Sequence, residues 1–197
     1  MVGQGRLAFL LAAWELKDVP REGWRLRSVG DGGSIESVAA HAWGTALLCM
    51  LFAPEVGVDR EEALEMALVH DLAEVETGDV ASLLDVSARS MSVEEKAERE
   101  AEAMARLATL APGEATERVV DRWRAYEAGS SDVARFVRDM NLLDMVLQAW
   151  WYERSGRVER GRLDEFFTSA RLRIALPFTA SLLEEIEAAR SNEATRP

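Results

Sequence analysis

Cysteine and histidine are rare in this 197-residue sequence, and basic residues are outnumbered by acidic ones. The one cysteine, Cys49, lies in an apolar stretch, so no disulfide can form within the chain, as is usual for cytoplasmic proteins. There are 23 lysines and arginines against 35 aspartates and glutamates, a formal net charge of −12. Nucleic-acid binding relies on positive charge that neutralises phosphates, so this balance argues against a nucleic-acid partner.

Long apolar stretches are missing as well. No segment approaches the roughly 20 apolar residues that a membrane-spanning helix needs, and residues 1–6 lack the pattern of a secretion signal. We therefore expect no membrane partner and a cytoplasmic location. The chain has only two histidines, His41 and His70. That number argues against the dinuclear metal sites that are built from several histidines.

Apolar residues recur at helical spacing through most of the sequence, without a sustained period-2 alternation. This pattern predicts an all-α single domain over residues 1–197, with a core at about 6–190 and a polar, fraying tail at 191–197. Predicted helices cover about residues 6–17, 36–53, 92–111, 115–127, 132–154, 162–175 and 178–190. Another helix, capped by Asp59, leads to His70.

Proline, glycine and charge mark finer features of these elements. In the first helix one face carries Leu7, Leu10, Leu11 and Trp14. Pro54 and Gly57 are expected to end the 36–53 helix. Looser segments are predicted at residues 17–27, at the Gly30–Ser34 turn, and from Gly78 to about Ser90. The 92–111 helix is expected to start at a Ser92 cap and to turn its many charges to solvent.

The segment from His70 to Asp79 carries most of the chemistry. His70 and Asp71 lie side by side at the end of a predicted helix, and imidazole and carboxylate groups bind Mn, Co, Fe, Ni or Zn. Glu74 is at i+4 from His70, so on a helix the two would share a face and could point into one cavity, and His41 could be a third ligand. A divalent ion activates water as a nucleophile, and Glu74 could orient that water or carry a proton.

A second group of polar residues precedes the helix that holds His41. Arg21, Arg25 and Arg27 lie around Trp24 in the predicted 17–27 loop. Guanidinium groups bind phosphate with paired hydrogen bonds, and an indole ring can stack on a base or cover a sugar. We therefore expect a small phosphorylated substrate, with these four residues as its binding groups.

Several motifs together resemble those of HD-domain metal-dependent phosphohydrolases, most closely the branch of YfbR-like 5'-deoxynucleotidases. The matching segments are Gly23–Arg27, Glu36–His41, Leu68–Asp79, Glu94–Glu100 and Phe136–Glu153. The resemblance extends from about residue 7 to 190. It implies an all-α HD fold, one divalent metal ion, hydrolysis of nucleoside 5'-monophosphates to nucleoside and phosphate, and usually a homodimer.

Residue by residue, the resemblance assigns His41, His70 and Asp71 as metal ligands and Glu74 as the catalytic glutamate. It assigns Asp79 as an acid that positions substrate or water. The fourth ligand departs from the family, which has aspartate at the position of Asn141. An asparagine can still bind a metal through its amide oxygen, but it brings no negative charge, so we expect weaker metal binding.

The neighbours of these ligands differ as well. Asp139 lies two residues before Asn141 and should face another way, whereas Asp144 resembles a separate acidic position in the family. Ala40 and Ser82 are milder departures. Two hypotheses follow. The first is an active metal-dependent phosphomonoesterase acting on (deoxy)nucleoside 5'-monophosphates. The second is a degenerate HD domain that binds a nucleotide or a partner with little or no turnover.

Overall fold

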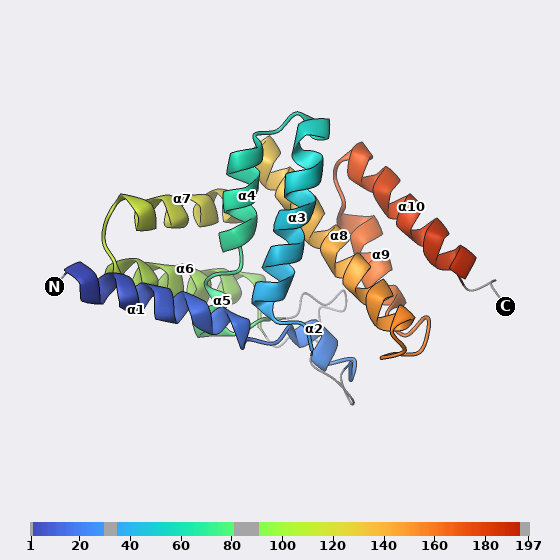
Figure 1. Ribbon diagram of the computed structural model, residues 1–197, viewed down its shortest axis with the longest axis horizontal. Helices are drawn as coiled ribbons and strands as arrows, with labels where there is room; N and C mark the ends of the chain where they lie inside the picture. The colour runs from blue at the N-terminus through green and yellow to red at the C-terminus, as the bar shows by residue number, and fades with distance from the viewer. Residues whose placement is uncertain (1, 30–34, 81–90, 194–197) are drawn as a thin grey trace.

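The computed structural model describes residues 2–29, 35–80 and 91–193, and this part of the chain is built from helices joined by turns and loops (Figure 1). Within those ranges the one β pairing is an isolated antiparallel bridge between Pro20 and Ser37, and the all-α prediction is confirmed. The α-helices are α1 Val2–Trp14, α2 Glu22–Arg25, α3 Val38–Val56, α4 Arg60–Val69, α5 Glu74–Thr77, α6 Val93–Leu110, α7 Glu114–Ala128, α8 Asp132–Arg154, α9 Asp164–Arg173 and α10 Pro177–Glu193. A short 3₁₀ helix, η1 Glu15–Lys17, follows α1.

Side-chain caps start four of these helices. The side chains of Ser37, Asp59, Ser92 and Ser131 each accept a hydrogen bond from the backbone N–H three residues later. Each cap satisfies a donor in the first helical turn that has no partner within the helix. The predicted caps at Asp59 and Ser92 are therefore confirmed.

The end of α3 differs from the prediction. Pro54 lies inside α3, which continues to Val56 and ends at Gly57, where the backbone is left-handed with φ 76°. Proline removes one backbone donor, whose partner would be the carbonyl of Met50. The side chain of Met50 is exposed, so water can reach that part of the helix, and the helix persists for one more turn.

The other two differences concern segments expected to be irregular. The short helix α2 forms within the predicted 17–27 loop. The tail expected to fray from residue 191 is helical to Glu193, because its carboxylate accepts from Trp150 Nε1 at 3.0 Å and pairs with Arg154. The Gly30–Ser34 turn, the stretch around Ser82 and residues 194–197 lie outside the described residues.

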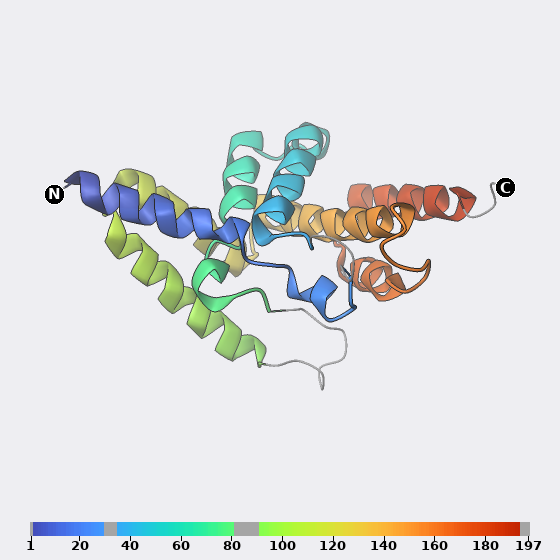
Figure 2. The same ribbon diagram turned by 60° about the horizontal axis from the view of Figure 1, so that its bottom comes forward.

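The helices form two groups on either side of the antiparallel pair α3 and α4 (Figures 1 and 2). Helices α8, α9 and α10 lie toward the C-terminal end and share the larger hydrophobic cluster with α3 and α4, around Phe136, Met140 and Tyr152. Helices α1, α6 and α7 lie toward the N-terminal end, around a smaller cluster that includes Met104 and Trp123. The segment between the two groups holds His70 and Asp71.

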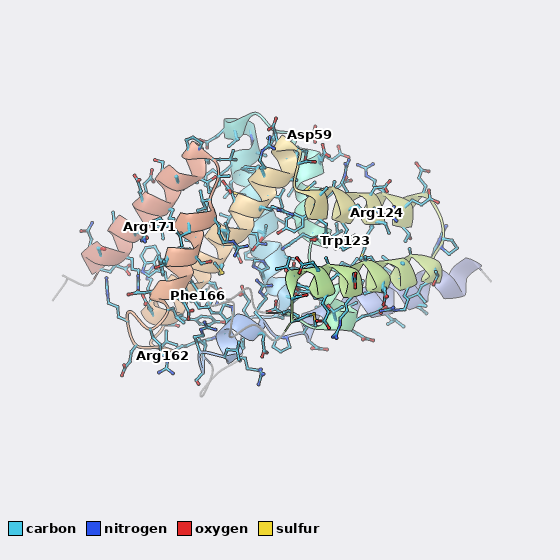
Figure 3. All side chains as sticks on the ribbon, turned by 180° about the vertical axis from the view of Figure 1, so that it is seen from behind. Asp59, Trp123, Arg124, Arg162, Phe166 and Arg171 are labelled. Atoms are coloured by element: carbon cyan, nitrogen blue, oxygen red, sulfur yellow. The ribbon has the colours of Figure 1, made fainter. Side chains whose placement is uncertain are left out.

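One face of the molecule keeps large apolar side chains in solvent. Helix α1 packs against α6 through Phe9, Ala12 and Ala13, and its predicted apolar stripe points outward. Helices α1, α3 and α4 face the viewer in Figure 1 and lie behind the other helices in Figure 3. We call their exposed side chains the apolar face: Leu7, Leu10, Leu11, Trp14, Trp43, Met50, Leu51 and Leu68. Across the described ranges, no helix combines the length and apolar character needed to cross a bilayer.

Candidate active site

A cavity of about 630 Å³ opens between α2, α5, α6, α8 and α9. Phe166, one of its lining residues, is labelled near the start of α9 and beside α2 in the view from behind, in which α1, α3 and α4 lie at the back (Figure 3). Its wall includes the charged and amide side chains of Arg21, Arg27, Asp71, Glu74, Asp79, Lys96, Arg138 and Asn141. The cavity therefore brings together residues from both ends of the chain.

The chain changes direction at His70. Asp71 and Glu74 line the inner end of this cavity, and His70 contacts Asp71 without itself lining the cavity. Helix α4 ends at Val69, and the next residues form tight turns in which the N–H of Leu72 bonds to the carbonyl of Val69. Glu74 then begins α5. A helix ends just before His70, as predicted, but this turn interrupts the helix face that His70 and Glu74 were expected to share.

Two imidazole nitrogens and one carboxylate oxygen converge at this end. The Nε2 atoms of His41 and His70 lie 3.8 Å and 3.2 Å from Asp71 Oδ2. Ligand atoms of the three residues all lie within 4.8 Å of one another. The other ring nitrogens are engaged, because Nδ1 of His41 bonds to Asp144 at 2.6 Å and Nδ1 of His70 bonds to the carbonyl of Ala67 at 2.7 Å.

These atoms fit a divalent metal ion. Both histidines are buried, and among the described residues their Nε2 atoms have no hydrogen-bond partner, which is rare for buried polar atoms. Burial and the positive charge of Arg21 lower the pKa of His41 to about 3, so its imidazole is neutral, as a metal ligand must be. Although burial opposes it, the neighbouring His70 ring and the charge of Arg21 hold the pKa of Asp71 well below its usual value.

Asn141 lies on α8 at the same cavity. Its Nδ2 donates to the hydroxyl of Tyr126 at 2.7 Å, so the carbonyl oxygen is the atom available to a metal. Asp139 faces elsewhere, as predicted, and accepts hydrogen bonds from the backbone N–H groups of Ala175 and Leu176. The charge missing at position 141 is therefore not restored by that neighbour.

Arg21 forms the positive part of the site. Its Nη1 lies 3.1 Å from Asp71 and from Asp79, and 3.8 Å from Glu74. Asp79 also accepts from the backbone N–H of Glu22 at 2.5 Å, so it fixes both Arg21 and the start of α2. Burial works against the charged guanidinium, but these carboxylates outweigh it and raise the pKa of Arg21.

Glu74 is buried with one oxygen, Oε2, lacking a hydrogen-bond partner. Burial and the charges of Asp71 and Asp79 raise its pKa well above the usual value for glutamate. Lys96 on α6 lies 3.6 Å from Glu74 Oε1 and 3.3 Å from Glu100. Glu74 therefore lies between two cations and two other carboxylates.

Lys96 was not among the site residues expected from sequence. The charged face of α6 was expected to be solvated, yet Lys96 is mostly covered and Glu100 is buried. A compositional signal was available, because the chain has only two lysines, Lys17 and Lys96, among its 23 basic residues. A chain that uses arginine almost everywhere else keeps a lysine beside Glu74.

The segment around Trp24 reaches the cavity only in part. Arg27 lines it and forms a two-bond ion pair with Glu165, whereas Arg25 pairs with Glu22, is exposed and is not part of the cavity wall. Trp24 lines the cavity but is buried. The centroid of its ring lies 4.3 Å from that of Phe166 and 5.4 Å from that of Tyr152, and its Nε1–H donates to Glu36. Neither face of the indole is therefore open for a base to stack on.

Comparisons with known proteins agree with this geometry. A family model described as an HD domain matches residues 13–179. The 5'-deoxynucleotidase HDDC2 of Mus musculus is 34% identical over 96% of this chain and 90% of its own length. Its Homo sapiens counterpart is 35% identical over 94% of this chain and 86% of its own length. The 5'-deoxynucleotidase hdd1 of Schizosaccharomyces pombe is 31% identical over 90% of this chain and 86% of its own length.

Solved structures give the same result at the level of the fold. The crystal structure of a protein from Pyrococcus horikoshii OT3 matches with a TM-score of 0.72 and 29% identity, over 94% of this chain and 98% of that one. A predicted metal-dependent phosphohydrolase from Magnetospirillum magnetotacticum matches with a TM-score of 0.67, over 96% and 95% of the two chains. At 22% identity the second match supports the fold alone.

Proposed function

This chain belongs to the HD-domain family, and on that premise we propose that it hydrolyses (deoxy)nucleoside 5'-monophosphates to nucleoside and phosphate. The relatives named 5'-deoxynucleotidases support this substrate class. The observation that carries the proposal is the convergence of two buried, unpartnered imidazole nitrogens on Asp71, beside Glu74 and Arg21. A bare structural core would have no reason to keep such atoms unpaired.

We propose that His41, His70, Asp71 and the amide oxygen of Asn141 hold one divalent ion. Mn, Co, Fe, Ni and Zn all suit this donor set of two imidazoles, a carboxylate and an amide oxygen. Such an ion, when bound, polarises a phosphate ester and makes neighbouring water more acidic. With one neutral donor in place of a carboxylate, the site holds the ion less tightly than four charged or imidazole ligands would.

Glu74 is the residue that we propose handles protons. Its raised pKa favours the protonated form more than in an ordinary glutamate, and this suits a group that protonates the leaving 5' oxygen of the nucleoside. Lys96 and Arg21 approach opposite oxygens of its carboxylate and hold it in place. Asp79 acts through Arg21, which it positions, rather than through the reacting atoms.

Arg21 is the group that we propose binds the phosphate, because it is the arginine nearest to the three carboxylates at the inner end of the cavity. Arg27, the edge of Trp24 and Phe166 line the part of the cavity that would receive the nucleoside. The geometry gives no reason to include Arg25 among the binding groups.

The experiment that tests this proposal measures phosphate release from matched ribo- and deoxyribonucleoside 5'-monophosphates, after chelation and reloading with each metal. Glu74→Gln should bind metal normally but turn over about 10²- to 10⁴-fold more slowly, because a general acid is lost. Glu76→Gln is the matched control, since Glu76 lies on the same short helix but pairs with Arg106. Unchanged turnover in Glu74→Gln would remove Glu74 from the mechanism.

The alternative, a degenerate HD domain that binds without turnover, is decided by the same assay. Asn141 is the residue that favours it, because it removes a negative ligand. Nucleotide binding with no phosphate release under any metal would select the alternative and reject the hydrolase.

We further propose that the chain is one domain, cytoplasmic, and a homodimer whose partner is a second copy. The two hydrophobic clusters meet at α4 and the turn after it, since Ala63 and Met66 belong to one and Leu72 and Ala73 to the other. The single buried thiol, Cys49, supports a reducing compartment. The apolar face supports self-association, because exposed apolar patches of this kind are typical of protein interfaces.

A further inference from the structure

Asp144 contacts His41 on the side away from the converging ligand atoms. Its Oδ2 lies 2.6 Å from Nδ1 of His41, while Nε2 of the same ring lies 3.8 Å from Asp71. Both side chains are largely covered, with 13% of Asp144 and 1% of His41 exposed. The imidazole of His41 therefore spans two carboxylates, one on each ring nitrogen.

Gly44 makes this contact possible. It lies on α3 one turn after His41, and a Cβ placed there would stand 1.9 Å from Asp144 Oδ1 and 2.8 Å from Asp144 Cγ. Real atoms do not approach so closely, so any larger residue would displace the carboxylate. A glycine in the middle of a helix is destabilising relative to alanine. Helix α3 nevertheless has glycine at position 44, where the missing side chain leaves room for Asp144.

From these contacts we infer that Asp144 is the positioning residue of His41: its carboxylate accepts the Nδ1 proton, so that Nε2 keeps its lone pair toward Asp71 and the metal. Histidines that bind metals commonly donate their other N–H to a carboxylate or a carbonyl, which fixes the tautomer and the ring orientation. This inference rests on the metal site of the proposed function. Asp144 contacts Nδ1 of His41, on the opposite side of the ring from Nε2, so it is not a ligand of the same ion.

Glu36 completes the surroundings of Asp144 but does not suggest a second ion. Ligand atoms of Glu36, His41 and Asp144 lie within 4.8 Å of one another. However, Nδ1 of His41 is already bonded to Asp144, and Glu36 already accepts the Nε1–H of Trp24 at 2.7 Å. We therefore assign Asp144 to the support of His41, with one ion per chain.

His70 provides a built-in reference for the experiment. Its Nδ1 bonds to the carbonyl of Ala67, which can only accept, so its tautomer is fixed without Asp144. Because the chain has only these two histidines, ¹⁵N spectra of histidine-labelled, metal-free protein report both tautomers separately. We expect both rings to carry the proton on Nδ1 in the parent protein.

The first test is Asp144→Ala, with folding checked by circular dichroism. His41 should lose its fixed Nδ1–H tautomer while His70 keeps its own, and the affinity for Mn²⁺ or Zn²⁺ measured by calorimetry should fall about 10- to 100-fold. Asp121→Ala, which removes an exposed carboxylate on α7, should change neither quantity. An unchanged His41 tautomer and an unchanged metal affinity in Asp144→Ala would overturn the inference.

The second test uses Gly44. Gly44→Ala should reproduce the loss of metal affinity, because its methyl group displaces the carboxylate. In an Asp144→Ala background the same methyl group has room, so Gly44→Ala should add little further loss. Additive losses would mean that Gly44 acts independently of Asp144, and they would refute the inference that Gly44 leaves room for the Asp144 carboxylate.

The spectra also separate this inference from the proposed function. If the parent binds no metal, the metal site of the proposed function fails. The tautomer of His41 still decides whether Asp144 positions that ring.

Discussion

Asn141 is the residue at which the chemistry of this site is most open to change. Its amide is already placed at the cavity and held by Tyr126, so the geometry of a ligand is present and only the charge is missing. Asn141→Asp should raise the affinity for a divalent ion by about 10-fold or more, since an added anionic ligand beside a cation is worth at least ~1.4 kcal/mol. Metal titration followed by calorimetry measures this, and phosphate release should rise in parallel. Equal affinities would mean that position 141 does not reach the ion.

Glu36 predicts how stability depends on pH in the metal-free protein. Burial and the charge of Asp144 raise its pKa to about 7, from an ordinary value of 4.5. The folded state therefore holds this proton more tightly than the unfolded chain, and stability is lost as pH rises from about 4.5 through 7. Glu36→Gln keeps an oxygen for Trp24 and removes the titrating group. When the pH rises from 5 to 8, the unfolding free energy of this variant should therefore fall by about 2 kcal/mol less than that of the parent.

The measurement is urea unfolding at both pH values with a chelator present. Glu153→Gln is a useful comparison, because Glu153 is a paired carboxylate held by Arg190. Parallel pH dependences for the parent and Glu36→Gln would contradict the assignment of the raised pKa.

At the scale of elements, the side chain of Asp139 links the first half of α8 to the segment just before α10. Asp139 is buried and accepts from the N–H groups of Ala175 and Leu176, just before the first residue of α10, Pro177. Asp139→Ala leaves two donors without partners and should lower the unfolding free energy by about 3 kcal/mol. Denaturant unfolding measures the loss, and the exposed Asp121→Ala should cost less than about 0.5 kcal/mol. A small loss at Asp139 would mean that water replaces the carboxylate.

The helices also show which parts of the fold could be predicted from the sequence. Helical periodicity and capping residues such as Asp59 and Ser92 located most helices, because both signals are local. The end of a helix at His70 was predicted, but the turn that separates His70 from Glu74 was not, because nothing between Val69 and Glu74 is a helix breaker. The role of Lys96 was missed for a related reason: charge patterns along one helix do not reveal which charge another element covers.

At the scale of the whole molecule, the apolar face and the cavity lie on opposite sides (Figures 1 and 3). Two copies meeting through α1, α3 and α4 would leave both cavities open to substrate. Leu51→Glu should therefore shift the protein to a monomer, with the mass measured by light scattering after gel filtration. Leu172→Glu is the matched control, because Leu172 is also an exposed leucine but lies on α9. A monomeric parent, or a Leu51→Glu dimer, would refute this interface.

Sequence reasoning could not foresee which apolar residues stay exposed. The stripe on α1 has the spacing of a core-facing helix, and only the packing of Phe9 against α6 reveals that the opposite side is buried. The candidate metal ligands were predictable because the motif joins His70 and Asp71 in sequence. The contact between Gly44 and Asp144 was not, because it joins two helices that are remote in the chain.

The position of Arg21 has a consequence for the order in which ligands arrive. Its guanidinium donates a hydrogen bond to Asp71 Oδ2, the same oxygen that both imidazole Nε2 atoms approach. An incoming cation must therefore compete with Arg21 for this oxygen. An anion that draws Arg21 away releases that oxygen, and each ligand thus prepares the pocket for the other. Thermodynamic linkage makes this effect reciprocal: phosphate tightens metal binding by the same factor by which metal tightens phosphate binding.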